Sequence, residues 1–135
     1  MWAGGLDSNG VPVTANGAVG VGLYRTEFLY MNREGQPNEE EHLAAYRQVI
    51  QGLGGIPITI RTLDLGADKQ VDGSASAHCA AACNPALGLR AIRLCLKDLD
   101  LFRPQLRAIL RASAEGPVRL MLPMLTNLGE VDHTR

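Results

Sequence analysis

Two arginines in this sequence stand where β-strands are expected to end, and each is followed closely by an acidic residue. Glu27 comes two positions after Arg25, and Asp64 comes three positions after Arg61. A guanidinium group has rigid, paired donors that match the oxygens of a phosphate or a carboxylate. Two such groups at the carboxyl edge of a parallel sheet would form a receptor for that kind of anion, with the acidic residues holding them in place. The spacing leaves open the alternative that both arginines form structural salt bridges.

A regular alternation of strand and helix patterns would bring these arginines to one edge of a sheet. The expected strands cover residues 19–23, 56–60 and 118–122, and the expected helices cover 38–53, 87–96 and 100–114, with a further helix starting after 127. This order favours parallel strands joined by right-handed crossovers, which defines an α/β fold. A complete (β/α)₈ barrel needs about 250 residues, and an open doubly wound sheet would normally begin with a clear first strand. We therefore expect a chain that is truncated at both ends.

The first expected helix has a capping signal and an apolar stripe. Asn38 stands three residues before Glu41, which predicts a capping box. The stripe expected to face the core consists of Leu43, Tyr46, Val49, Ile50 and Leu53. His42 follows the glutamates, and we expect it to lie in solvent.

The helix expected over 100–114 should bury one face and expose another. The residues assigned to the buried face are Leu106, Ile109, Leu110 and Ser113. Arg103, Arg107 and Arg111 recur every four residues and are assigned to a solvated face, because a net charge of −1 gives no support for a nucleic-acid surface. Cys95, on the apolar side of the preceding helix, is expected to be a core residue.

The composition narrows the class of protein. The 135 residues carry 13 Lys and Arg against 14 Asp and Glu, so there is no cationic excess to displace counterions from nucleic acid. No apolar run approaches the roughly 20 residues that a membrane-spanning helix needs. The first residues lack the basic region typical of a secretory signal. Three cysteines without a framework spacing indicate a reducing compartment, and we expect the cytoplasm.

A long segment without periodicity, residues 66–85, separates the second expected strand from the next helix. Loops of this length are usually functional or disordered. His78, Cys79 and Cys83 lie within it, but three ligands fall short of the four that structural zinc sites use. We therefore expect no metal site there, and the role of the segment and of its cysteines stays open.

Six segments of the chain, in order, are similar to one known family. They are Gly20–Met31, Pro37–Tyr46, Arg61–Lys69, Asn84–Arg93, Gln105–Ser113 and Met121–Met124. Together they resemble the phosphoenolpyruvate-binding barrel of the phosphoenolpyruvate-protein phosphotransferases, enzyme I of the bacterial sugar phosphotransferase system. Several long motifs in the same order are more specific than one short pattern. The resemblance covers residues 15–135 and implies an incomplete TIM (β/α) barrel domain of about three strands with crossover helices, whereas residues 1–14 match poorly.

The resemblance implies roles for particular residues. Arg25, Arg61 and Arg90 would bind the phosphate and carboxylate groups of phosphoenolpyruvate. Asp64 and Asn84 would support them. The family moves the phosphoryl group to a histidine on a separate helical domain, with Mg²⁺ bridging the substrate and a cysteine protonating the enolate carbon. The magnesium ligands, that cysteine and that histidine find no counterpart in this sequence, so we expect no catalytic residue in it.

These implications lead to an expectation for the isolated chain. It should supply phosphoenolpyruvate-binding arginines but be inactive and poorly stable alone. For the full-length parent, the resemblance implies a homodimer and a phospho-carrier protein as partner, reached through an N-terminal domain. Two alternatives stay open: a related dikinase or phosphoenolpyruvate synthase barrel, and a truncated remnant that binds anions weakly or not at all. The segment 23–29 favours enzyme I over the dikinases.

Overall fold

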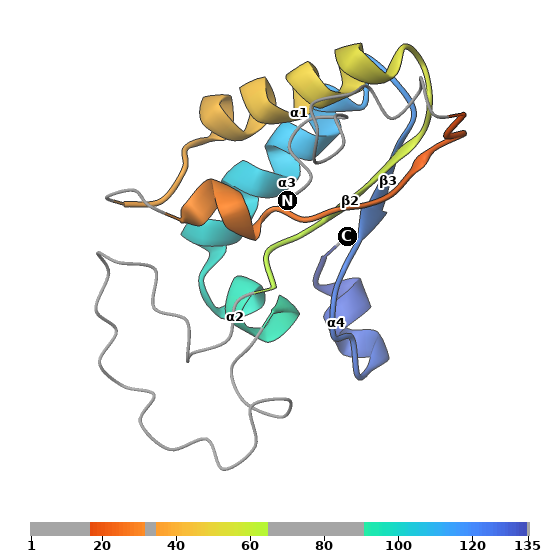
Figure 1. The fold of residues 1–135 in the computed structure, drawn as a ribbon. Helices are drawn as coiled ribbons and strands as arrows, with labels where there is room; N and C mark the ends of the chain where they lie inside the picture. The colour runs from red at the N-terminus through yellow and green to blue at the C-terminus, as the bar shows by residue number, and fades with distance from the viewer. Residues whose placement is uncertain (1–16, 32–34, 65–90, 135) are drawn as a thin grey trace.

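A three-stranded sheet with the two long helices on one face is the framework of the described residues (Figure 1). The computed structural model describes residues 17–31, 35–64 and 91–134. The elements in chain order are β1 (Val21–Tyr24), the 3₁₀ helix η2 (Glu27–Tyr30), α1 (Glu39–Leu53), β2 (Ile58–Arg61), α2 (Ile92–Lys97), α3 (Leu99–Ala112), β3 (Val118–Met121) and α4 (Leu128–Asp132). The expected strands and helices are present with small shifts at their ends. The helix expected over 87–96 begins at Ile92, with the non-helical Ala91 as its N-cap, and residues 87–90 lie outside the described residues.

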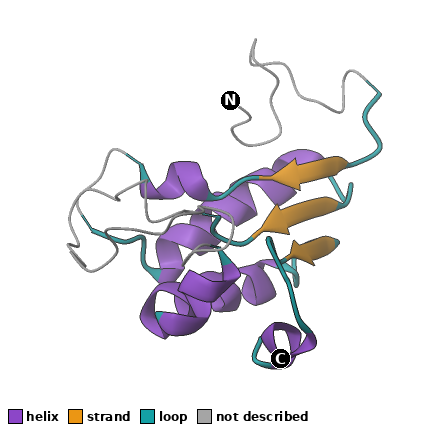
Figure 2. Ribbon diagram, turned by 90° about the horizontal axis from the view of Figure 1, so that it is seen from below, coloured by secondary structure: helices purple, strands orange, loops and turns teal. Residues whose placement is uncertain are grey.

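The strands pair in parallel, in the order β1–β2–β3, so their carboxyl ends share one edge (Figure 2). β2 and β3 are in unbroken register, and Ile60 aligns with Leu120. β1 is irregular: Val21 aligns with Ile58, whereas Tyr24 aligns with Ile60, so β1 accommodates one extra residue, as a β-bulge does. Parallel strands joined by helices confirm the predicted α/β class.

The long helix α1 begins and ends at caps encoded in its own sequence. The Oδ1 of Asn38 accepts a hydrogen bond from the backbone N–H of Glu41 at 2.9 Å, and the Oε2 of Glu41 accepts one from the N–H of Asn38 at 2.8 Å. At the other end Gly54 has a φ of 57°, in the left-handed region that glycine enters without a steric cost. The predicted capping box is confirmed, and local interactions define both ends of α1.

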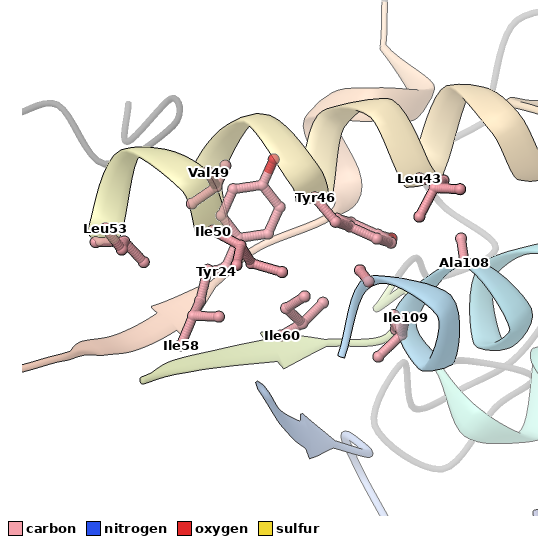
Figure 3. Close-up of a cluster of buried hydrophobic side chains, with 11 residues drawn as sticks. Tyr24, Leu43, Tyr46, Val49, Ile50, Leu53, Ile58, Ile60, Ala108 and Ile109 are labelled. Carbon is pink, nitrogen blue, oxygen red and sulfur yellow. The ribbon is translucent and has the colours of Figure 1, made fainter. Parts of the chain in front are cut away.

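The main core lies between the sheet and the two long helices α1 and α3, which pack side by side (Figure 3). The whole stripe predicted for α1 is buried there. The sheet and α3 contribute Tyr24, Ile58, Ile60, Ala108 and Ile109. A second cluster joins α2, the first part of α3 and Leu63, and it includes the buried Cys95, as the sequence predicts. Because each fully buried aliphatic or aromatic side chain contributes about 1.5–3 kcal/mol, these clusters hold the helix layer against the sheet.

The prediction that His42 lies in solvent is wrong, because its side chain is fully buried. The Nε2 of His42 lies 3.2 Å from the hydroxyl oxygen of Tyr30, and its Nδ1 lies 3.2 Å from that of Tyr46. Hydrogen bonds from both sides remove most of the cost of burying an imidazole. Tyr30 comes from η2, so the spacing within α1 gives no indication of this partner.

The orientation of α3 also differs from the prediction at two positions. Ile109 is buried as predicted and Leu106 is partly buried, but Leu110 is 68% exposed and Ser113 is exposed. The buried stripe instead passes through Gln105 and Ala112. Each step along a helix turns by about 100°, so the residue next to a buried one often leaves the interface.

The outer surface of the two long helices is charged. Arg103, Arg107 and Arg111 are exposed, as the sequence predicts. The Nη1 of Arg111 lies 2.8 Å from the Oε1 of Glu39 and also pairs with Glu40, which joins α3 to the first turn of α1. None of the helices in the described ranges is both long and apolar enough to cross a membrane.

Candidate anion-binding site

Arg61, the last residue of β2, is held by two carboxylates at the carboxyl edge of the sheet. Its Nη2 donates a hydrogen bond to the Oε1 of Glu27 at 2.7 Å, and its Nη1 lies 3.3 Å from the Oδ2 of Asp64. The same Glu27 oxygen accepts a hydrogen bond from the backbone N–H of Asp64 at 3.2 Å. The three side chains are only 12–18% exposed. Charge-assisted bonds in such partly buried positions restrict the guanidinium to one orientation.

One donor of Arg61 has no partner among the described residues. Its Nε is buried and makes no hydrogen bond to any of them, although both of its Nη atoms are engaged by carboxylates. A buried donor that lacks a partner costs roughly 1–3 kcal/mol and is rare in folded proteins. An anion oxygen that reached the Nε would remove that cost, because phosphate and carboxylate oxygens accept hydrogen bonds from guanidinium N–H groups.

Arg25 occupies the neighbouring position at the same edge. It directly follows Tyr24, and Arg61 directly follows Ile60, the residue aligned with Tyr24 across β1 and β2. The structure thus brings the two arginines predicted from the sequence to adjacent strand ends. They differ in their surroundings, because Arg25 is exposed and forms no ion pair with any side chain in the described ranges.

A polar side chain of α3, which the sequence pattern does not single out, connects the two strand ends. Gln105 of α3 is fully buried. Its Oε1 accepts a hydrogen bond from the backbone N–H of Leu63 at 3.0 Å, and its Nε2 donates one to the Oγ1 of Thr26 at 3.0 Å. The signal that could have revealed it is its place in the apolar stripe of α3, between Phe102 and Ile109. A glutamine at such a position indicates a specific polar partner, because buried amides need one.

Several predicted positions lie outside the described residues. These are Arg90 and Asn84, the segment 66–85 and the cysteines Cys79 and Cys83. Within the described ranges, no three His, Cys, Asp or Glu side chains lie together in a way that could hold a metal ion. The described residues therefore contain no such cluster, and the anion chemistry at this edge rests on the arginines of the chain.

Cys95 has no chemical role at this edge. Burial raises the pKa of its thiol from 9.0 to about 12, with the nearby carboxylate of Asp98 acting in the same direction. Its Sγ lies 3.9 Å from the carbonyl oxygen of Leu63, which the thiol can approach as a weak donor. A thiol that stays protonated at neutral pH is a poor nucleophile, so Cys95 serves as a core residue.

A protein-family model described as PEP-utilising enzyme, PEP-binding domain, matches residues 7–135, and the chain belongs to that family. Among curated proteins, it is 54% identical over 121 residues to the phosphoenolpyruvate-protein phosphotransferase of Cupriavidus necator, an alignment covering 89% of this chain. It is 51% identical to the proteins of the same name from Staphylococcus aureus, over 118 residues, and Geobacillus stearothermophilus, over 116 residues, covering 87% and 86% of this chain.

The resemblance inferred from the six sequence segments is therefore confirmed at the level of the family. The alignments cover only 20% of the length of each of these relatives, so the chain spans about a fifth of the proteins that it matches. The activity and substrates of these full-length relatives therefore apply to this chain only as a proposal.

Proposed function

We propose that this chain supplies the phosphate-clamping part of a phosphoenolpyruvate site, within a phosphotransferase that passes the phosphoryl group to a protein histidine. In this proposal Arg25 and Arg61 bind the phosphate and carboxylate groups of phosphoenolpyruvate, and Arg90 is a third ligand at the same edge. Asp64 and Asn84 support them, together with Glu27. The arginines would offset the charge on the transferring oxygens and hold them in line for the acceptor.

The observation that carries the proposal is the state of Arg61. Two carboxylates orient its guanidinium at the carboxyl edge of a parallel sheet, where α/β proteins commonly bind ligands, and its buried Nε has no hydrogen-bond partner among the described residues. A salt bridge with a structural role alone would gain no stability from leaving that donor unpaired. The arrangement therefore favours a ligand-binding role over the structural alternative.

The finer features of the fold and setting belong to the same proposal. Residues 15–135 would form one incomplete TIM (β/α) barrel domain preceded by a less similar segment, 1–14. The complete protein would work in the cytoplasm in sugar transport, as a homodimer that reaches a phospho-carrier protein through an N-terminal domain. Mg²⁺ would be held by residues other than those described. The isolated chain would bind phosphoenolpyruvate without turning it over.

The proposal is tested by isothermal titration calorimetry, which measures the heat of binding of phosphoenolpyruvate to the 135-residue chain. We expect saturable binding that pyruvate, which lacks the phosphate, does not reproduce. Arg61→Met should abolish measurable binding, whereas Arg103→Met, on the exposed surface of α3, should leave it unchanged. Equal binding by the Arg61→Met variant would contradict the proposal.

A second measurement addresses turnover. The chain is mixed with phosphoenolpyruvate, Mg²⁺ and a purified phospho-acceptor domain from a similar phosphotransferase, and pyruvate release is followed. We expect binding without release. Release of pyruvate at a rate above that of the acceptor domain alone would show that the isolated chain is an active enzyme. It would refute the hypothesis that the chain is inactive by itself.

A further inference from the structure

The side-chain amide of Gln105 joins the two segments that carry the arginines. Thr26 directly follows Arg25, and Leu63 lies two residues after Arg61. The amide bonds to both, at 3.0 Å each, from a position with no exposed surface. No other described side chain has hydrogen bonds to both strand ends at once from α3, the helix on which the edge rests.

The directions of these bonds allow one arrangement of the amide. A backbone N–H only donates, so the N–H of Leu63 must face the Oε1 of Gln105. The Oγ1 of Thr26 donates to the carbonyl oxygen of Arg61 at 2.9 Å, so it is free to accept from the Nε2 of Gln105. The result is a continuous chain of donors and acceptors that runs from the N–H of Leu63 through Gln105 and Thr26 to the carbonyl oxygen of Arg61.

This chain of bonds is directional, and close analogues of glutamine would break it in different ways. A glutamate could still accept from Leu63 but would present an oxygen, and no donor, to Thr26. A methionine has a similar shape but can satisfy neither group, which leaves a buried N–H and a hydroxyl with fewer partners. The core could tolerate a side chain of this size, so the amide itself is what the two strand ends require.

We propose that Gln105 is a positioning residue, which sets Arg61 and Arg25 at the separation that their shared anion requires. This inference rests on the proposed function, because the anion is taken to be phosphoenolpyruvate. Gln105 does not touch the ligand in this proposal. It acts through Thr26 and Leu63 on the backbone that carries the two guanidinium groups, where small displacements of a binding group reduce affinity strongly.

The test compares variants of the 135-residue chain by two measurements. One is the dissociation constant for phosphoenolpyruvate, and the other is the ¹⁵N–¹H resonance of the Arg61 Nε in the ligand-free protein. Gln105→Met should weaken binding about tenfold, as expected for a lost hydrogen bond, and should shift the Arg61 resonance. Ile109→Val and Ile109→Ala lie one turn along the same buried stripe and provide controls with graded losses of stability.

A second pair of variants tests the path through Thr26. Thr26→Ser keeps the hydroxyl and should retain wild-type binding, whereas Thr26→Val should reproduce the effect of Gln105→Met. The double variant Thr26→Val/Gln105→Met should bind no more weakly than about tenfold below wild type, because both changes break one connection. Multiplying effects, or equal weakening by an Ile109 variant of the same stability, would overturn the inference.

The two measurements separate this inference from the function on which it rests. If the wild-type chain fails to bind phosphoenolpyruvate, the proposed function is wrong, and the Arg61 resonance then decides the positioning role alone. A shift in Gln105→Met and Thr26→Val, but not in Ile109→Val, supports it. An unchanged resonance in all variants overturns it.

Discussion

β2 and β3 are neighbours in unbroken register, yet equivalent positions on them have different surroundings. Ile60 of β2 is fully buried, whereas its partner Leu120 on β3 is 46% exposed. At the ends of these strands, Arg61 is held by two carboxylates, whereas Met121 beside it is 43% exposed. In the sheet of the described residues β2 has a strand on each side, and β3 has one on a single side. The difference lies in what covers each strand, because Ile60 belongs to the main core formed with α1 and α3, whereas Leu120 is not among its buried residues.

The largest expected difference between the strands is in the cost of removing aliphatic side chains. Ile60→Ala should lower the free energy of unfolding by about 2–5 kcal/mol, because it leaves a cavity in the core. Leu120→Ala should lower it by less than about 1 kcal/mol, because water already reaches that side chain. Urea unfolding of both variants measures these values. Equal losses would show that the two strands are equivalent in stability despite their surroundings.

Removing an arginine should likewise lower the free energy of unfolding more on β2 than on β3. Arg61→Met leaves Glu27 and Asp64 facing each other without a cation and should cost about 2 kcal/mol. Arg119 on β3 is exposed, so Arg119→Met should change the stability by no more than about 0.5 kcal/mol. The comparison is made by urea unfolding at low salt. A loss for Arg119→Met as large as that for Arg61→Met would contradict it.

The core beside β2 should also make stability depend on alkaline pH. Burial raises the pKa of the Cys95 thiol from 9.0 to about 12, and it raises the pKa of Tyr24 to about 12. Above about pH 9 the unfolded chain therefore loses protons that the folded chain keeps, and stability falls as pH rises toward 12. We expect a loss of about 1–2 kcal/mol between about pH 8 and pH 10. Unfolding curves of Cys95→Ala should show a smaller loss, and an identical pH dependence would contradict this cause.

The smallest effects concern the two capping boxes. Asn38→Ala should lower global stability by about 1 kcal/mol, because α1 packs on the main core. Asn127 forms the same cap at the start of α4, which has five residues and follows the exposed end of β3. Asn127→Ala should leave the unfolding midpoint unchanged and increase amide hydrogen exchange within α4 alone. A global loss equal to that of Asn38→Ala would show that α4 unfolds together with the core.

The parts of the fold that depend on short stretches of sequence were open to prediction. The capping box at Asn38, the stripe of α1, the parallel order of the strands and the start of a last helix after residue 127 are all present as expected. Predictions failed where a distant element supplies the environment. His42 is buried because η2 brings Tyr30 to it, and Leu110 is exposed because the neighbours of α3 cover a slightly different face.

The site shows the same division. Residue type and position at strand ends suffice to select Arg25, Arg61, Glu27 and Asp64, and the structure places them at one edge. Gln105 escapes such reasoning, because it lies 42 positions after Leu63 and 79 after Thr26. The hydrogen bonds of Gln105 to Leu63 and Thr26 form only once α3 packs against the sheet. Polar residues in the middle of an apolar stripe are the feature by which similar positions can be found in other sequences.

The two carboxylates around Arg61 also have a consequence for electrostatic attraction. Of the described side chains at this edge, one guanidinium is matched by two negative charges within 2.7 and 3.3 Å. A ligand carrying several negative charges would therefore feel little long-range pull from Arg61, which offers it directed hydrogen bonds at short range. Arg25, exposed and without such partners in the described ranges, would supply the long-range field. Added salt should consequently lower the association rate of the ligand, because it screens the charge of Arg25. It should leave the short-range hydrogen bonds from Arg61 unchanged.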